Sequence, residues 1–211
     1  MKKALLIQAN GNNMRLSSFF KQPKYELFYN GLKIIEHIYK NVSTLKEYDI
    51  FLALRQDAVL TQINKQINVI RCKPTYSRID TLKEVIPHFK KYHELLIHDC
   101  DVIISSDVLK KMNGNCIAVS TYKNDGLKYG FIELDDNFQY LKSNEKEYES
   151  DYISIGAYSV NLKEFKNYIK NINDDSLLYY FNTCTEPKVV YSKTFINLGD
   201  IDSYINNLWK L

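Results

Sequence analysis

"IQANGNNMRLSSFFKQPK", residues 7–24, follows a short apolar run at residues 4–7 that has the pattern of a buried strand. Its first seven residues hold one Gly, three Asn and one Gln, and three cations follow, Arg15, Lys21 and Lys24. In α/β proteins, ligands bind beyond the carboxyl ends of the strands, and backbone N–H groups of such a loop can hold phosphate oxygens. The stretch therefore favours an α/β fold with a phosphate-binding loop, and a solvated surface loop is the alternative.

The remaining apolar runs alternate between strand and helix spacing. Strands are expected at 48–55, 67–72, 152–160 and 188–200, and at 94–104, where a carboxylate pair interrupts the strand. A hairpin is expected at 129–145. Helices are expected at 32–42, 57–67, 78–92, 105–112, 161–169 and 200–211, with a cap at Ser105 or Ser106 and a break near Pro87. This alternation predicts a single α/β domain over residues 1–211, with a mixed, mostly parallel sheet flanked by helices.

Composition excludes several classes of protein. The 211 residues are 45% hydrophobic and 25% charged, which is typical of a globular domain with a sizeable core. The net charge of +3 comes with scattered Lys and Arg, so a nucleic-acid partner is not expected. The four cysteines show no CxxC spacing and are expected to be reduced thiols. No signal peptide or membrane span is indicated, and we expect a cytoplasmic protein.

The opening loop lacks both the GxGxxG and the GxxxxGK[ST] patterns. It resembles the signature loop of nucleotidyltransferases that activate sugar phosphates and small alcohol phosphates. That signature is a strand, then A-x-G-x-G-x-R, then P-K about ten residues later. Ala9, Gly11, Asn13 and Arg15 occupy the first four slots, and Lys24 ends the second motif. Asn13 replaces a family glycine, and Asn tolerates a positive φ better than most residues.

Five further segments resemble the same family in the same order. They are YNGLKIIEHI (29–38), LLIHDCDVI (95–103), YGFIELDDN with NEKE (129–147), YISIGAYSV (152–160) and FINLGDIDSY (195–204). The resemblance implies a single Rossmann-like domain of the GT-A type. It also implies an enzyme that joins a nucleoside triphosphate to a phosphorylated acceptor and releases pyrophosphate.

The resemblance assigns the nucleotide to the opening loop. Arg15 and Lys24 would be the catalytic cations that bind the triphosphate. Further nucleotide contacts would come from Gln8, Ala9, Asn10, Gly11, Asn12, Asn13, Arg78, Thr81 and Asp99.

The stretch SRIDTLKEVI, residues 77–86, bears on the base. It resembles the R-x-x-S segment of the methylerythritol-phosphate cytidylyltransferases, with Arg78 in the Arg slot and Thr81 in the Ser slot. This favours CTP over UTP, dTTP or GTP. The alternative is that the stretch is only a helix face, on which Leu82, Val85 and Ile86 pack against a core.

Two carboxylates, Asp99 and Asp101, stand two residues apart at the end of an apolar strand. Mg²⁺ binds through one or two carboxylates together with substrate phosphates. The resemblance places one ligand at Asp101 and a second at Asn197, where the family has Asp, and Asp200 is a possible substitute. The alternative is an Asp-rich turn in which Asp101 acts as a cap.

The acceptor is assigned to the hairpin region. The resemblance places it at Tyr129, Gly130, Glu145 and Lys146. The polar texture after the hairpin predicts a small acceptor: a polyol, amino-alcohol or amino-acid phosphate such as glutamine phosphate, used in capsule or surface polysaccharide modification.

Other interpretations remain open at this point. One is a sugar-1-phosphate enzyme that uses another nucleotide, and another is a non-catalytic nucleotide-binding relative. A dinucleotide oxidoreductase fits less well because its glycines are missing. His98 is expected to be a structural histidine rather than a catalytic one. Expected partners are CTP and the acceptor alone, without nucleic acid or membrane, in a monomer or homodimer.

Overall fold

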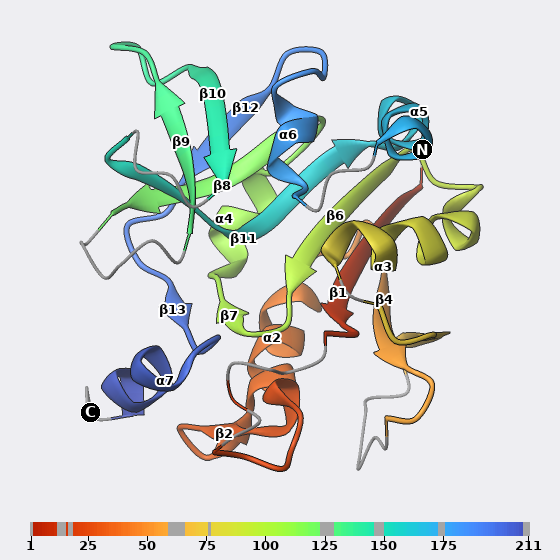
Figure 1. Cartoon of the computed structure of the whole chain (residues 1–211), viewed down its shortest axis with the longest axis vertical. Helices are drawn as coiled ribbons and strands as arrows, with labels where there is room; N and C mark the ends of the chain where they lie inside the picture. The colour runs from red at the N-terminus through yellow and green to blue at the C-terminus, as the bar shows by residue number, and fades with distance from the viewer. Residues whose placement is uncertain are drawn as a thin grey trace.

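The computed structural model describes residues 2–11, 16, 19–58, 66–75, 77–122, 129–145, 150–172 and 176–208 (Figure 1). Its strands are β1 (Lys3–Ala9), β2 (Phe28–Tyr29), β3 (Leu32–Lys33), β4 (Tyr48–Arg55), β5 (Asn68–Cys72), β6 (Glu94–Asp99), β7 (Val102–Ile103), β8 (Cys116–Thr121), β9 (Gly130–Leu134), β10 (Tyr140–Glu145), β11 (Tyr152–Asn161), β12 (Lys188–Tyr191) and β13 (Ile196–Asn197). Its α-helices are α2 (Ile34–Val42), α3 (Arg78–Val85), α4 (Ser106–Lys111), α5 (Leu162–Asn171), α6 (Leu178–Phe181) and α7 (Ile201–Leu208), and two 3₁₀ helices span Lys24–Glu26 (η1) and Ile86–Phe89 (η2).

One nine-stranded sheet organises the described part of the chain, in the order β10-β9-β11-β6-β1-β4-β5. Off this path, β8 pairs with β11, and β12 pairs with β8. The strands β6, β1, β4 and β5 are mutually parallel. Of the nine strands described in this sheet, β10 and β11 run antiparallel to the other seven. The predicted α/β fold with a mixed, mostly parallel sheet is confirmed.

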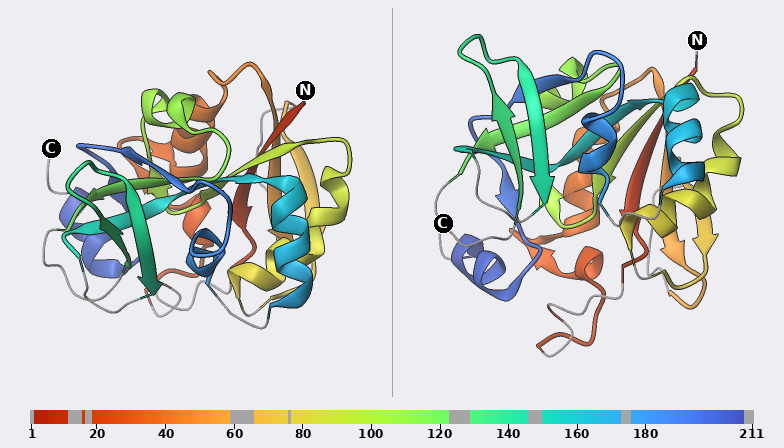
Figure 2. Two further views of the ribbon diagram at one scale, coloured as in Figure 1. Left: turned by 90° about the horizontal axis from the view of Figure 1, so that it is seen from above. Right: turned by 45° about the horizontal axis from the view of Figure 1, so that its top comes forward.

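The central strands are buried on both faces. In β1, Leu5 and Ile7 belong to one apolar cluster, and Ala4 and Leu6 belong to a second one on the opposite face, as expected from the alternation of side chains along a strand. Helices α2 and α4 contribute to the first cluster, and α3, α5 and α6 to the second. Figure 2 shows these two helical layers on either side of the sheet. A parallel sheet covered on both faces explains the near-continuous apolar runs in the sequence.

Local signals set several boundaries. Ser77 caps α3 by accepting a hydrogen bond from the Asp80 N–H, and Ser105 caps α4 through the Val108 N–H. Helix α3 ends at Val85, and the chain continues as the 3₁₀ helix η2, which contains Pro87. The predicted hairpin is the antiparallel pair β9–β10.

One prediction was wrong, that of a single strand over 188–200. The chain forms β12 on the edge of the main sheet and then β13, which pairs with β7 instead. Between them the Ser192 hydroxyl donates to the Thr194 carbonyl, and this local turn takes the chain away from β8. Residues 59–65 of the helix expected at 57–67 lie outside the described part.

The described helices include none with the length and apolar character needed to cross a bilayer. The four cysteines are free thiols, as expected.

Candidate active site

A cavity of about 490 Å³ lies beyond the carboxyl ends of β1 and β6, where Gln8 and Asp99 are neighbours in the sheet. Its size is within the usual range for small-molecule sites. Thirteen of the residues selected from the sequence line this cavity: Gln8, Ala9, Asn10, Gly11, Lys24, Arg78, Thr81, Asp99, Asp101, Tyr129, Gly130, Glu145 and Asn197. The other four, Asn12, Asn13, Arg15 and Lys146, lie outside the described residues.

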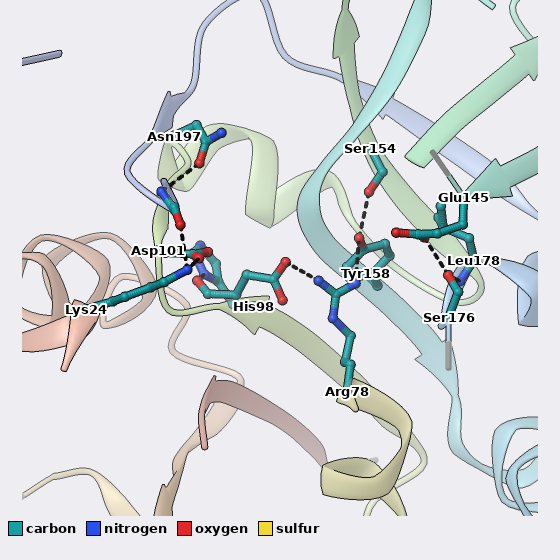
Figure 3. A network of polar contacts seen from close by, with 12 residues as sticks. Lys24, Arg78, His98, Asp101, Glu145, Ser154, Tyr158, Ser176, Leu178 and Asn197 are labelled. Atoms are coloured by element: carbon teal, nitrogen blue, oxygen red, sulfur yellow. Dashed lines mark hydrogen bonds and ion pairs between the residues drawn. The ribbon is translucent and has the colours of Figure 1, made fainter. Parts of the chain in front are cut away.

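Lys24 is a buried cation in the cavity wall, with 8% of its surface exposed. The 3₁₀ helix η1 brings it there, and its Nζ lies 2.9 Å from Asp101 Oδ2 and 2.6 Å from the Gly199 carbonyl oxygen (Figure 3). A Cβ atom on Gly199 would stand 2.7 Å from Asp101 Oδ2. The glycine therefore leaves room for the ion pair.

The Asp101 and Asn197 side chains approach the same point. Both side-chain oxygens lie close to the position that a Cβ on Gly199 would occupy, Asp101 Oδ2 at 2.7 Å and Asn197 Oδ1 at 3.1 Å. The Asn197 oxygen accepts the Gly199 N–H at 2.9 Å, and its Nδ2 donates to the Tyr129 hydroxyl at 2.9 Å. One carboxylate and one amide carbonyl are hard oxygen donors, and this set fits Mg²⁺ if substrate phosphates and water complete the coordination.

Asp200 has a different role from the one considered for it. Its two carboxylate oxygens accept hydrogen bonds from the N–H and hydroxyl of Ser203, at the start of α7. Among the described residues, no three His, Cys, Asp or Glu side chains gather into a ready metal site. Any metal here would depend on the substrate for part of its ligand set.

A second ion pair lines the same cavity. Arg78 Nη2 is 2.7 Å from Asp99 Oδ2, and Nη1 donates to the Tyr158 hydroxyl at 3.1 Å. The Ser154 hydroxyl also donates to Tyr158, at 2.7 Å. Figure 3 shows Arg78 of α3 in the middle of this chain of contacts, which links the end of β6 to β11. Tyr158 was not selected from the sequence, where it is one of 17 tyrosines with no distinguishing pattern.

The electrostatics of this pair follow from burial. Burial raises the pKa of Asp99, against the lowering effect of Arg78, and Asp101 adds to the increase. Burial also lowers the pKa of His98 to about 4, so this imidazole is neutral at pH 7. Its Nδ1 lies 2.7 Å from the Asp99 backbone oxygen. This backbone contact agrees with the expectation of a structural histidine.

The loop after β1 is tied to α3 through Asn10. Its Nδ2 donates to the Thr75 hydroxyl at 3.0 Å and approaches the Thr81 hydroxyl at 3.4 Å. Thr75 and Thr81 are themselves 2.7 Å apart. The Asn10 Oδ1 and both side-chain polar atoms of Gln8 are buried without a hydrogen-bond partner among the described residues. Buried polar groups are normally satisfied, so these three atoms indicate a place for a polar ligand.

Position 156 in β11 requires glycine because the Asp99 side chain lies close to its backbone. Its φ is +85°, and a Cβ there would stand 2.9 Å from Asp99 Oδ2. We expect Gly156→Ala to lower the free energy of unfolding by about 3 kcal/mol, because left-handed strain and overpacking act together. Gly114→Ala is the matched control, since its φ is +64° and nothing lies near its Cβ position. Urea unfolding measures both, and an equal loss in the two variants would contradict the packing argument.

Comparison with known proteins identifies the fold. No protein-family model and no curated protein matches the chain. A Bacillus anthracis protein assigned as a glucose-1-phosphate thymidylyltransferase aligns with a TM-score of 0.80 at 15% identity, over 98% of this chain and 94% of its own. The inositol-1-phosphate CTP transferase from T. maritima aligns with a TM-score of 0.75 at 15% identity, over 96% and 91%. A UDP-glucose pyrophosphorylase in complex with UDP-glucose aligns with a TM-score of 0.79 at 16% identity, over 99% of this chain and 97% of its own.

These structures cover almost the whole chain and are all similar to it at low identity. The chain therefore has the fold of the sugar-phosphate nucleotidyltransferases. The resemblance stated from the sequence is confirmed at the level of the fold.

Proposed function

We propose that this protein is a nucleotidyltransferase that joins CTP to a small phosphorylated acceptor and releases pyrophosphate. The observation that carries the proposal is a single cavity at the carboxyl edge of the sheet. That cavity gathers the loop after β1, the cation of Lys24 and the carboxylate of Asp101. A cation and a metal-binding oxygen placed side by side suit a polyphosphate.

In the proposed reaction an oxygen of the acceptor phosphate attacks the α-phosphorus of CTP. The bond from that phosphorus to the oxygen bridging the α and β positions breaks, and pyrophosphate leaves with the electron pair. The attacking oxygen is already anionic at neutral pH, so no strong general base is needed. The protein's task is to align two anions and to neutralise charge. This agrees with a buried His98 that does not line the cavity.

Lys24 would neutralise charge on the triphosphate, with Arg15 as a second cation. The backbone N–H groups of the loop after β1 would hold the phosphate oxygens. Asp101 and Asn197 would hold Mg²⁺, which when bound would offset the charge of the phosphates. The ion pair of Lys24 with Asp101 supports this arrangement, because the proposed cation and the proposed metal ligand lie side by side.

The base is proposed to lie against the β1 loop and the start of α3. Gln8 and Asn10 there offer amide groups, which can both donate to and accept from the polar edge of a cytosine. Thr81 and Arg78 line the same wall and hold neighbouring groups in place. The solved structure of an inositol-1-phosphate CTP transferase has the same fold, which supports a CTP enzyme with a small phosphorylated acceptor.

A screen of four nucleotides tests the proposal. We expect CTP to bind at least tenfold more tightly than UTP, dTTP or GTP in calorimetric titrations with Mg²⁺. We also expect CTP to release pyrophosphate with one member of a panel of polyol, amino-alcohol, amino-acid and sugar phosphates. A tenfold preference for another nucleotide would replace the CTP assignment with a sugar-1-phosphate enzyme that uses that nucleotide. Binding without any turnover would favour a non-catalytic relative.

A role in capsule or surface polysaccharide modification belongs to the same proposal. It rests on the small polar acceptor inferred from residues 129–160, and it includes a cytoplasmic location and a monomer or homodimer. Identification of the preferred acceptor by mass spectrometry of the product decides this part.

A further inference from the structure

Glu145 is a carboxylate in the cavity wall that forms no ion pair with any residue in the described part of the chain. It ends β10, and its Oε2 accepts a hydrogen bond from the Ser176 hydroxyl at 2.6 Å. No Lys, Arg or His of the described residues lies within ion-pair distance of it. Figure 3 shows its carboxylate between Tyr158 and Ser176.

The other charged side chains that line the cavity are paired with one another. Lys24 is 2.9 Å from Asp101, and Arg78 is 2.7 Å from Asp99. Within the described lining, Glu145 is therefore the charged group outside an ion pair, and the lining holds three carboxylates against two cations, of which Arg78 also acts on Glu145 from a distance. A half-buried carboxylate without a counter-ion is costly, and it is retained at a position where a ligand can supply the opposite charge.

Glu145 is held in place from two sides. Gly130 is its direct neighbour across the β9–β10 pair, and a Cβ there would stand 3.4 Å from Glu145 Oε2 and 1.9 Å from Leu178. The Ser176 hydroxyl that donates to Glu145 also accepts the Leu178 N–H at 3.2 Å, at the start of α6. The carboxylate therefore lies against Gly130 of β9 on one side and is hydrogen-bonded to Ser176, just before α6, on the other. A charge held in one position can discriminate between ligands.

We infer that the phosphorylated acceptor carries a primary amino group, which as an ammonium pairs with Glu145. This inference rests on the proposed function and adds the class of acceptor to it. An ammonium offers three N–H donors and a full charge, so its hydrogen bond to a carboxylate is about twice as strong as that of a neutral donor. A quaternary ammonium has no such donor, and a sugar or polyol hydroxyl brings no charge.

Matched pairs of acceptors test the inference. Ethanolamine phosphate is compared with 2-hydroxyethyl phosphate, and glucosamine 1-phosphate with glucose 1-phosphate, each with CTP and Mg²⁺. We expect kcat/KM for the better amine to exceed that of its hydroxyl counterpart by about 30-fold or more, the scale of losing one partner of a desolvated charge pair. Calorimetric titration of the same compounds into the enzyme with CMP gives the preference independently of turnover.

Glu145→Gln removes the charge and keeps the shape, and we expect it to reduce the amine preference to within about threefold. Glu133→Gln, on the exposed part of β9, is the control and should keep both the rate and the preference. A wild-type enzyme that binds the hydroxyl members as well as the amines would overturn the inference, and so would a preference that survives in Glu145→Gln. Failure of CTP itself to bind would instead refute the proposed function.

Discussion

Replacement of Lys24 by alanine is expected to lower kcat/KM by about 10² or more. The reason is that its buried Nζ lies beside Asp101 and the Gly199 carbonyl, at the wall where the triphosphate is proposed to bind. Removing one preorganised electrostatic contact of this kind costs about 10²–10³ in rate. The measurement is a steady-state assay of pyrophosphate release with CTP as the varied substrate.

Lys21→Ala is the matched control for this experiment. Lys21 belongs to the same segment but is exposed and does not line the cavity. Its replacement should change kcat/KM by less than about twofold, in line with the small effects of exposed charges. Near wild-type turnover in Lys24→Ala would remove Lys24 from the mechanism, whatever the control shows.

Asp101→Asn is expected to lower activity by about 10³ and to remove its dependence on Mg²⁺. The substitution keeps the size of the side chain but removes the single charge among the two proposed metal ligands, Asp101 and Asn197. Direct titration of Mn²⁺ by electron paramagnetic resonance should show weaker binding in the presence of CTP. Asp107→Asn, on the exposed surface of α4, should behave as the wild type.

The melting temperature without metal separates this role from a structural one. Asp101 is paired with Lys24, so some loss of stability is expected, but about 1 kcal/mol corresponds to only about 2–4 °C in a chain of this length. A much larger fall in Asp101→Asn, with unchanged Mn²⁺ binding, would mean that the carboxylate serves the fold. The structure already places the cap of α4 at Ser105, not at Asp101.

The fold was predictable because its signals are local and repeated. The apolar runs that became β1 and β6 are buried on both faces, and buried strands of this kind read as continuous apolar segments. Caps such as Ser77 and Ser105 have side-chain chemistry that acts within three residues. The division of residues 188–200 between β12 and β13 was missed because it depends on which distant strand each half meets.

For the candidate site, the sequence indicated which residues to select but not their contacts. The loop resemblance selected residues far apart in the chain, and the described ones line one cavity. The sequence did not indicate how they pair. Arg78 contacts Asp99 and Tyr158, and Lys24 contacts Asp101, and these partners are 21, 80 and 77 residues apart. The glycines that make room for the carboxylates, Gly156 and Gly199, have a role that only the spatial neighbours define.

The most direct test of nucleotidyl transfer in this cavity is ³¹P nuclear magnetic resonance of a reaction that contains CTP, Mg²⁺ and the preferred acceptor phosphate. We predict the loss of the three CTP signals and the equimolar appearance of free pyrophosphate and of a new diphosphate diester. The same spectrum of the Lys24→Ala enzyme should remain that of CTP over the same time. CTP that stays intact with every acceptor, despite binding in calorimetry, would contradict the account, and so would hydrolysis to CDP and phosphate.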